Sequence, residues 1–175
     1  MRKPRQPPSK TGEGPAPLDP ESARGRALKL LSRREHSAAE LAAKLQRRGA
    51  DADVARDAVR TMADAGWQSD ERYAEMLVRN RIEQGYGPLR IRMELTQAGV
   101  PDAEIRTALE TADVDWTARC VAVCQRKFKK QPSGAGEWQK QYRFLASHGF
   151  TAAQIRVALK AALGVDEVDV DDSDF

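Results

Sequence analysis

The chain has 175 residues, of which 41% are hydrophobic and 31% charged, which suits one ordinary domain or several small helical units. No run approaches the roughly 18 apolar residues of a membrane span, and the N-terminus lacks the apolar core of a secretory signal. We therefore expect a cytoplasmic protein with no membrane contact.

The net charge of +3 conceals an asymmetry, because residues 166–175 contain six acidic residues and no basic one. The rest of the chain has 29 basic against 20 acidic residues, a net charge of +9. A basic body indicates a polyanionic partner or an acidic protein partner. The acidic tail is interpreted either as a competitor for that partner or as a solubilising segment.

In chain order, residues 1–20 form a basic, Pro-rich head that is predicted to be disordered, and residues 165–175 form an acidic tail with the same prediction. The body between them repeats with a period of about 50 residues. The clearest matches are Leu45, Leu95 and Leu145, then Gly49, Gly99 and Gly149, then Arg56, Arg106 and Arg156.

Each repeat is predicted to contain three helices. The first helices are expected over 21–35, 69–85 and 115–130, the second over 37–48, 88–98 and 136–148, and the third over 51–65, 101–112 and 151–163. The predicted fold is therefore all-α, with three tandem three-helix repeats over residues 21–66, 67–113 and 114–164. Such small units bury little surface alone, so we expect them to pack on one another in an elongated, curved array.

Helix ends carry recognisable signals. Ser37, Asp51 and Thr151 are good N-cap residues, and Glu40 would complete a capping box with Ser37. Each repeat ends its second helix at Gly49, Gly99 or Gly149. Trp67 and Trp116 are expected to pack at the junctions between repeats.

The stretch from Asp70 to Val100 reads as two helices around a corner, Gly85-Tyr86-Gly87-Pro88. Apolar residues at three- and four-residue steps place Tyr73, Ile91 and Leu95 on the inner faces. Arg81 lies partly inward, where Glu94 could pair with it. Three arginines lie off the apolar stripe and are predicted to form a cationic surface near the corner, namely Arg79, Arg90 and Arg92.

No motif for catalysis, metal binding or cofactor binding is found in the sequence. His36 and His148 are interpreted as helix-end residues without partners for acid–base work. Cys120 and Cys124, four residues apart on a predicted helix, are interpreted as small buried hydrophobic residues. The sequence thus indicates a protein that is not an enzyme.

Basic residues gather on the first and second helices rather than on the third. In the first unit they are Arg24, Arg26, Lys29, Arg33, Arg34, Lys44, Arg47 and Arg48, and in the third unit they are Arg126, Lys127, Lys129, Lys130, Lys140 and Arg143. Because the third helices of the first two units are mixed or acidic, they would make poor recognition helices for DNA. Any single base is equally well explained by a solvated surface, so only the clustering indicates contact with phosphates or an acidic surface.

The block from Asp70 to Val100, with Arg81, Gly85-Tyr-Gly-Pro, Arg90-Ile-Arg92 and Glu94-Leu95, resembles the signature of the RecX family. Asp113-Val-Asp-Trp116 and Arg143-Phe-Leu also match, and the similarity covers about residues 22–163. The resemblance implies a non-enzymatic modulator that lies in the groove of the RecA filament on single-stranded DNA. We expect the protein to be a monomer. It further implies inhibition of ATPase and strand exchange and loss of filament stability, in DNA repair and the SOS response.

Carried over by motif, the candidate contact residues are Arg79, Tyr86, Arg90 and Arg92, to which the basic cluster of the third unit is added. Tyr73, Arg81, Ile91, Glu94, Leu95 and the repeated glycines are expected to hold the repeats together. The alternative is a DNA-binding helical protein that acts through phosphate contacts alone, without sequence preference.

Overall fold

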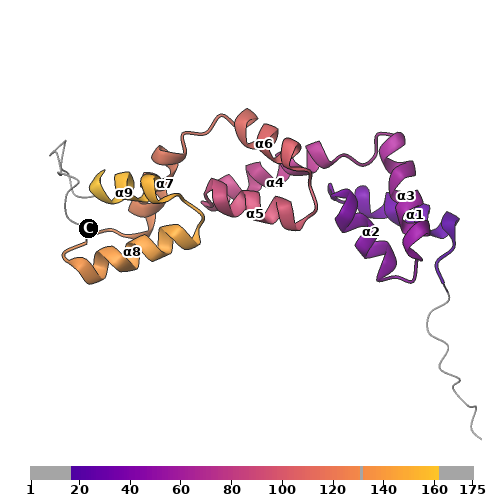
Figure 1. Ribbon diagram of the computed structural model, residues 1–175, viewed down its shortest axis with the longest axis horizontal. Helices are drawn as coiled ribbons and strands as arrows, with labels where there is room; N and C mark the ends of the chain where they lie inside the picture. Colours follow the sequence, from indigo (N-terminus) through magenta and orange to yellow (C-terminus); the bar gives the residue numbers. More distant parts are fainter. Residues whose placement is uncertain (1–16, 131, 162–175) are drawn as a thin grey trace, which may run out of the picture.

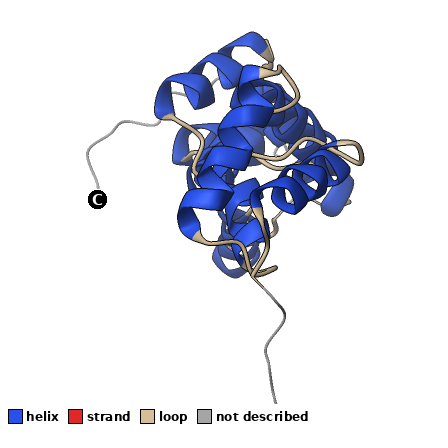
Figure 2. Cartoon of the chain, turned by 90° about the vertical axis from the view of Figure 1, so that its right-hand side faces the viewer, coloured by secondary structure: helices blue, strands red, loops and turns tan. Residues whose placement is uncertain are grey.

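The computed structural model describes residues 17–130 and 132–161, and these residues form nine helices and no strand. Figure 1 shows the helices in a curved row of three groups, and Figure 2 views the row from one end. The helices are α1 (Pro20–Leu31), α2 (Ala38–Gln46), α3 (Ala52–Asp64), α4 (Asp70–Gln84), α5 (Pro88–Gln97), α6 (Asp102–Thr111), α7 (Trp116–Lys127), α8 (Ala135–Ser147) and α9 (Ala152–Ala161). The predicted all-α array of three-helix units is confirmed. Most of the predicted head, residues 1–16, and the whole predicted tail lie outside the described residues.

Each three-helix unit has a hydrophobic core of its own. Leu45, Leu95 and Leu145 occupy equivalent places in the three cores, and each is fully buried. The next helix adds Ala55, Ile105 and Ile155 in the same register, all nearly or fully buried. Most buried apolar residues therefore pack within their own unit, and the junctions between units depend mainly on the other contacts described below.

The helix ends follow the predicted signals in part. The Ser37 hydroxyl accepts a hydrogen bond from the Glu40 N–H at 3.0 Å, but the Glu40 carboxylate contacts Arg34 and His36. A full capping box is found at Thr151, whose hydroxyl accepts from the Gln154 N–H while its own N–H donates to the Gln154 side chain. Asp51 precedes α3 without a capping bond from its side chain.

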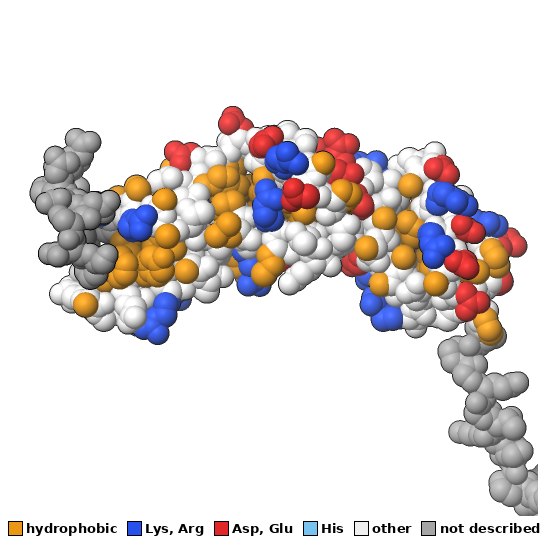
Figure 3. Space-filling view, in the orientation of Figure 1, with side chains coloured by type: hydrophobic (Ala, Val, Ile, Leu, Met, Phe, Trp, Pro, Cys, Tyr) orange, Lys and Arg blue, Asp and Glu red, His pale blue; other side chains and the backbone are white. Residues whose placement is uncertain are grey.

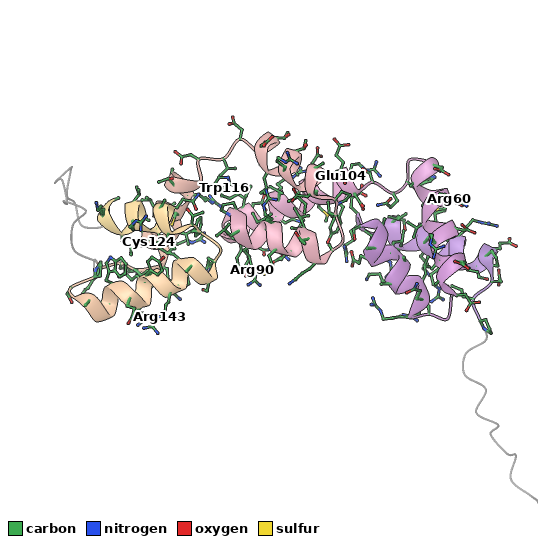
Figure 4. All side chains as sticks on the ribbon, viewed as in Figure 1. Arg60, Arg90, Glu104, Trp116, Cys124 and Arg143 are labelled. Carbon is green, nitrogen blue, oxygen red and sulfur yellow. The ribbon has the colours of Figure 1, made fainter. Side chains whose placement is uncertain are left out.

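The two junction tryptophans behave differently. Trp116, in the first turn of α7, packs against the core of the second unit and so lies between the second and third units (Figure 4). The expectation for Trp67 is wrong, because this residue is 59% exposed. Its place is taken by Gln68, which is buried and hydrogen-bonded at the junction between the first and second units.

Among the described residues, no helix combines the length and the apolar character needed to cross a membrane.

Candidate partner-binding surface

The predicted corner between α4 and α5 is a joint that holds the second unit to the third. The Gly87 N–H donates to the His148 carbonyl oxygen at 2.7 Å, and the Leu89 N–H donates to the Gly149 carbonyl oxygen at 3.0 Å. A Cβ atom on Gly87 would lie 2.4 Å from the Gly149 oxygen. Gly149 has a φ of +87°, and a Cβ atom there would lie 2.3 Å from the Arg90 Cβ. The two backbones approach so closely that only glycine fits on either side.

The junction between the first and second units is built in the same way, 50 residues earlier. The Ser37 hydroxyl, at the position equivalent to Gly87, donates to the Ala98 carbonyl oxygen at 2.6 Å. Gly99, equivalent to Gly149, has a φ of +74°, and a Cβ atom there would lie 2.7 Å from the Ala39 Cβ. In both joints the start of a second helix therefore docks on the glycine that ends the second helix of the following unit.

Polar side chains reinforce the first joint. Arg72 on α4 forms an ion pair with Glu35 at 2.8 Å. The Asp70 carboxylate accepts from the Ala38 N–H at 2.7 Å, and the Gln68 amide donates to the His36 carbonyl oxygen at 3.3 Å. Sequence reasoning missed these residues, because nothing in their spacing links positions more than 30 residues apart.

The two ends of the array differ from the joints between units. At one end the Leu18 N–H donates to the Gly49 carbonyl oxygen at 2.9 Å, as Leu89 does to Gly149 in the second joint. At the other end α8 begins at Ala135, whereas in register with α2 and α5 it would begin at Trp138. The additional turn therefore precedes the position at which α2 and α5 begin.

Tyr86 lies between the joint and the arginines of the corner. Its ring stacks on that of His148, with the centroids 5.4 Å apart. On α5, the Arg90 guanidinium lies 5.4 Å from the Tyr86 ring centroid, and the Arg81 guanidinium on α4 lies 6.0 Å from it. Tyr86 is half-buried and is held by both units.

The Glu94 carboxylate holds two of these arginines. It pairs with Arg81 at 2.6 Å and with Arg90 at 2.8 Å. Burial by itself would raise the pKa of Glu94, but the hydrogen bonds from Arg90 and Arg81 outweigh it, and the pKa is lowered. Glu94 is therefore ionised near neutral pH and fixes Arg81 and Arg90 between α4 and α5.

The remaining corner arginines have different surroundings. Arg92 pairs with Asp102 at 2.7 Å, so it links α5 to α6. Arg79 is exposed and has no ion pair within the part of the chain that the structure describes. Of the predicted cationic surface, Arg79 alone presents a guanidinium free of such a pair, while Arg90 and Arg92 are held by carboxylates.

The basic cluster of the third unit divides into packed and open members. The Arg126 guanidinium packs on Gly85, where an added Cβ atom would lie 2.8 Å from one of its nitrogens. The Lys127 nitrogen lies 5.6 Å from the Phe144 ring centroid. Arg143, labelled on α8 in Figure 4, donates to the Gln139 side chain at 3.0 Å. The open members line a hollow of about 340 Å³ between α7 and α8, which Glu137 also lines, and they are Lys129, Lys130 and Lys140.

The geometry thus gives an elongated body with two joints of the same construction and separate clusters of exposed bases. No described group of His, Cys, Asp and Glu side chains is arranged to hold a metal ion. Such a body suits contact with an extended partner at several points, and the cations suit a negatively charged surface.

Comparison with known proteins gives three matches to family models, in the same order along the chain. The RecX first three-helix domain matches residues 23–60, the second matches 69–109 and the third matches 113–159. A protein named regulatory protein RecX from Halorhodospira halophila is 45% identical over 148 residues, which cover 84% of this chain and 92% of that protein. One from Acidithiobacillus ferrooxidans is 43% identical over 136 residues, 77% of this chain and 87% of its own.

Solved structures agree with the fold. The crystal structure of RecX from Lactobacillus salivarius aligns with a TM-score of 0.70 at 20% identity and covers 83% of this chain and 97% of its own. A crystal structure titled regulatory protein RecX also gives a TM-score of 0.70, at 22% identity over 81% of this chain and 71% of that one. At these identities the likeness concerns the architecture alone.

Proposed function

The chain belongs to the RecX family of regulatory proteins, and we propose that it regulates the RecA recombinase by binding along the RecA filament on single-stranded DNA. Family membership over all three units, at 45% identity to a relative that the chain almost spans, carries this proposal. The regulation that we propose is inhibition of ATPase and strand exchange, without any chemistry by this protein.

The two joints support this mode of action. Each joint holds neighbouring units through close backbone contact, so the array presents its units at set positions. A filament repeats the same surface at regular intervals, and a body that contacts several protomers gains affinity from multivalency. Free RecA offers one such surface at a time. The protein therefore prefers the filament, and it shifts the filament between states by its differential affinity for them.

The contact residues that we propose are four exposed bases of the second and third units that form no described ion pair, namely Arg79, Lys129, Lys130 and Lys140. Arg126, Lys127 and Arg143 border the same surface. Tyr86, Arg90 and Arg92 act indirectly in this proposal, because they hold the joint and α6 in place. This assigns the corner a positioning role and the third unit the larger share of direct contact.

Binding to a preformed filament tests the proposal. Fluorescently labelled protein is titrated with RecA filaments on oligo(dT), with RecA alone and with oligo(dT) alone at moderate salt. We expect the filament to bind at least tenfold more tightly than either component. The triple substitution Lys129→Gln, Lys130→Gln, Lys140→Gln should weaken filament binding, while Arg56→Gln, Arg60→Gln, Arg106→Gln, which removes the same charge elsewhere, should not. Equal binding to filament and bare oligo(dT) would contradict the proposal.

A further inference from the structure

The first unit contains a groove that the filament proposal does not use. It lies between α1 and α2 and has a volume of about 670 Å³. Lys and Arg supply six of its ten lining residues, three from α1 and the turn after it and three from α2 and the turn after it: Arg26, Lys29, Arg33, Lys44, Arg47 and Arg48. The groove therefore has a cationic row along each side.

These charges have few partners of their own. Within the described residues, the carboxylates form no ion pair with Arg26, Lys29, Arg33, Arg47 or Arg48, and Lys44 alone reaches Glu40, at 3.6 Å. By contrast, Arg56 and Arg60 on α3 pair with Asp53 and Asp57 at 2.9 Å. Figure 3 shows such a mixture of basic (blue) and acidic (red) side chains over the visible face of the first unit.

Helix-end electrostatics account for only part of this pattern. Lys29 and Lys44 lie in the last turns of their helices, and a cation is favoured there by the helix dipole. The helix dipole does not explain why α1 and α2, with the turns after them, place four further arginines around the same groove. Like charges that face each other across a groove repel, and a bound anion would remove that repulsion.

Gly25 provides a second, independent observation. It lies in the middle of α1, on the wall of the groove, where glycine costs a helix about 1 kcal/mol relative to alanine. A Cβ atom there would meet no atom within 4 Å, so packing does not demand glycine. Because Gly25 has no side chain, a ligand in the groove could approach the α1 backbone closely.

The lining residues indicate the class of ligand. Guanidinium groups match phosphate oxygens in a two-pronged geometry, and the lining includes no aromatic side chain on which a base could stack. Packed helices lie about 8–10 Å apart, so the crevice between them suits one phosphodiester backbone rather than the full width of a duplex. We propose that the α1–α2 groove binds the phosphate backbone of a single-stranded nucleic acid, without reading its sequence.

This inference goes beyond the proposed function, since it assigns a direct contact with nucleic acid to the first unit and requires no recombinase. It is tested with the full chain and fluorescein-labelled oligo(dT), by anisotropy at several salt concentrations. The triple substitution Lys29→Gln, Arg33→Gln, Arg47→Gln affects exposed side chains and should weaken binding at least about tenfold. Loss of three phosphate contacts should also make the slope of log affinity against log salt less negative by about 2.

Two further variants keep the test specific. Arg56→Gln, Arg60→Gln, Arg106→Gln removes the same charge from arginines that are paired with carboxylates, and it should retain affinity within about twofold. Gly25→Leu changes no charge, favours the helix and fills part of the groove, so it should weaken oligo(dT) binding several-fold in a protein that is no less stable.

Three results would overturn the inference. One is an equal loss of affinity in the groove variant and the charge-matched control. Another is a duplex that binds as tightly as oligo(dT) with the same sensitivity to the groove substitutions. The third is an oligoglutamate peptide that binds the groove more tightly than oligo(dT), which would make it a docking site for an acidic protein segment. None of these results bears on filament binding, which is measured separately with RecA present.

Discussion

Gly87 and Gly149 meet across the joint between the second and third units, where a Cβ atom on Gly87 would lie 2.4 Å from the Gly149 carbonyl oxygen. The Gly87 N–H also donates to the His148 carbonyl oxygen, and at the equivalent place in the first joint the Ser37 hydroxyl donates to the Ala98 carbonyl oxygen, so the same arrangement is used twice along the array. The relative placement of the units therefore depends on a few close backbone contacts, on polar side chains such as Arg72 and Gln68, and on Trp116, rather than on one continuous hydrophobic core.

Replacing Gly87 with alanine should open the second joint. The added methyl group collides with the Gly149 backbone, and we expect a loss of about 1–3 kcal/mol, measured as a lower midpoint of urea unfolding. Gly134→Ala is the matched control, because Gly134 is also an N-cap glycine with extended backbone but has open space around it. A Gly87→Ala protein as stable as the Gly134→Ala protein would show that the joint does not hold the units.

Glu94→Gln should destabilise the second unit by about 1–2 kcal/mol at pH 7, because Arg81 and Arg90 lose their shared charged acceptor. The folded state lowers the pKa of Glu94, so its stabilisation is present above the ordinary pKa of 4.5 and is lost as the pH falls through the folded-state value. Wild type and variant should therefore converge in thermal stability near pH 3. Glu110→Gln, at an exposed position, should change stability little at either pH.

The first joint should weaken in mild acid because of His36. Burial lowers the pKa of this residue, although Nδ1 lies 2.9 Å from a Glu40 carboxylate oxygen, which favours the charged form. The unfolded chain therefore binds a proton at a higher pH than the folded chain, and stability falls as the pH drops below about 6.5 toward the folded-state pKa.

Melting temperatures between pH 7.5 and 5.5 check this expectation. A His36→Asn variant should show a smaller loss over that interval than wild type. His148 remains in both proteins, so the difference between them reports on His36. Parallel pH profiles for the two proteins would refute the role of His36.

The two cysteines should be inert in the native protein. Both are buried in the core of the third unit, and burial raises the pKa of Cys120 to about 12. At pH 8 the thiolate is therefore scarce as well as inaccessible. A thiol-reactive chromogen should label neither cysteine in native buffer and both in urea; rapid labelling of the native protein would contradict the packing described for α7.

The sequence predicted the array well because its strongest signals are local and recur three times. The leucines and glycines at 50-residue spacing report core positions and helix ends, and the pairing of Arg81 with Glu94 follows from helix geometry around a short corner. The joints were not predictable in the same way. Gly87 and Gly149 are 62 residues apart, and no residue pattern around either glycine predicts that their backbones are in contact.

The sequence predicts which basic residues lie at the surface, but it does not predict which carboxylates they pair with. Arg90 and Arg92 lie off the apolar stripe as expected, yet Glu94 and Asp102 hold them. The choice between a free and a paired arginine depends on the rotation of neighbouring helices, which periodicity alone does not give. Trp67 does not pack at the junction as predicted; instead, Gln68 donates a hydrogen bond to the His36 carbonyl oxygen there, and Asp70 accepts one from the Ala38 N–H.

The most direct test of the proposed role is the single-stranded-DNA-dependent ATPase of the cognate RecA, titrated with this protein at two salt concentrations. We predict inhibition at less than one molecule per RecA protomer that persists at moderate salt, because one elongated molecule contacts several protomers. An ATPase rate that stays unchanged across the titration at both salt concentrations would contradict filament regulation by this protein.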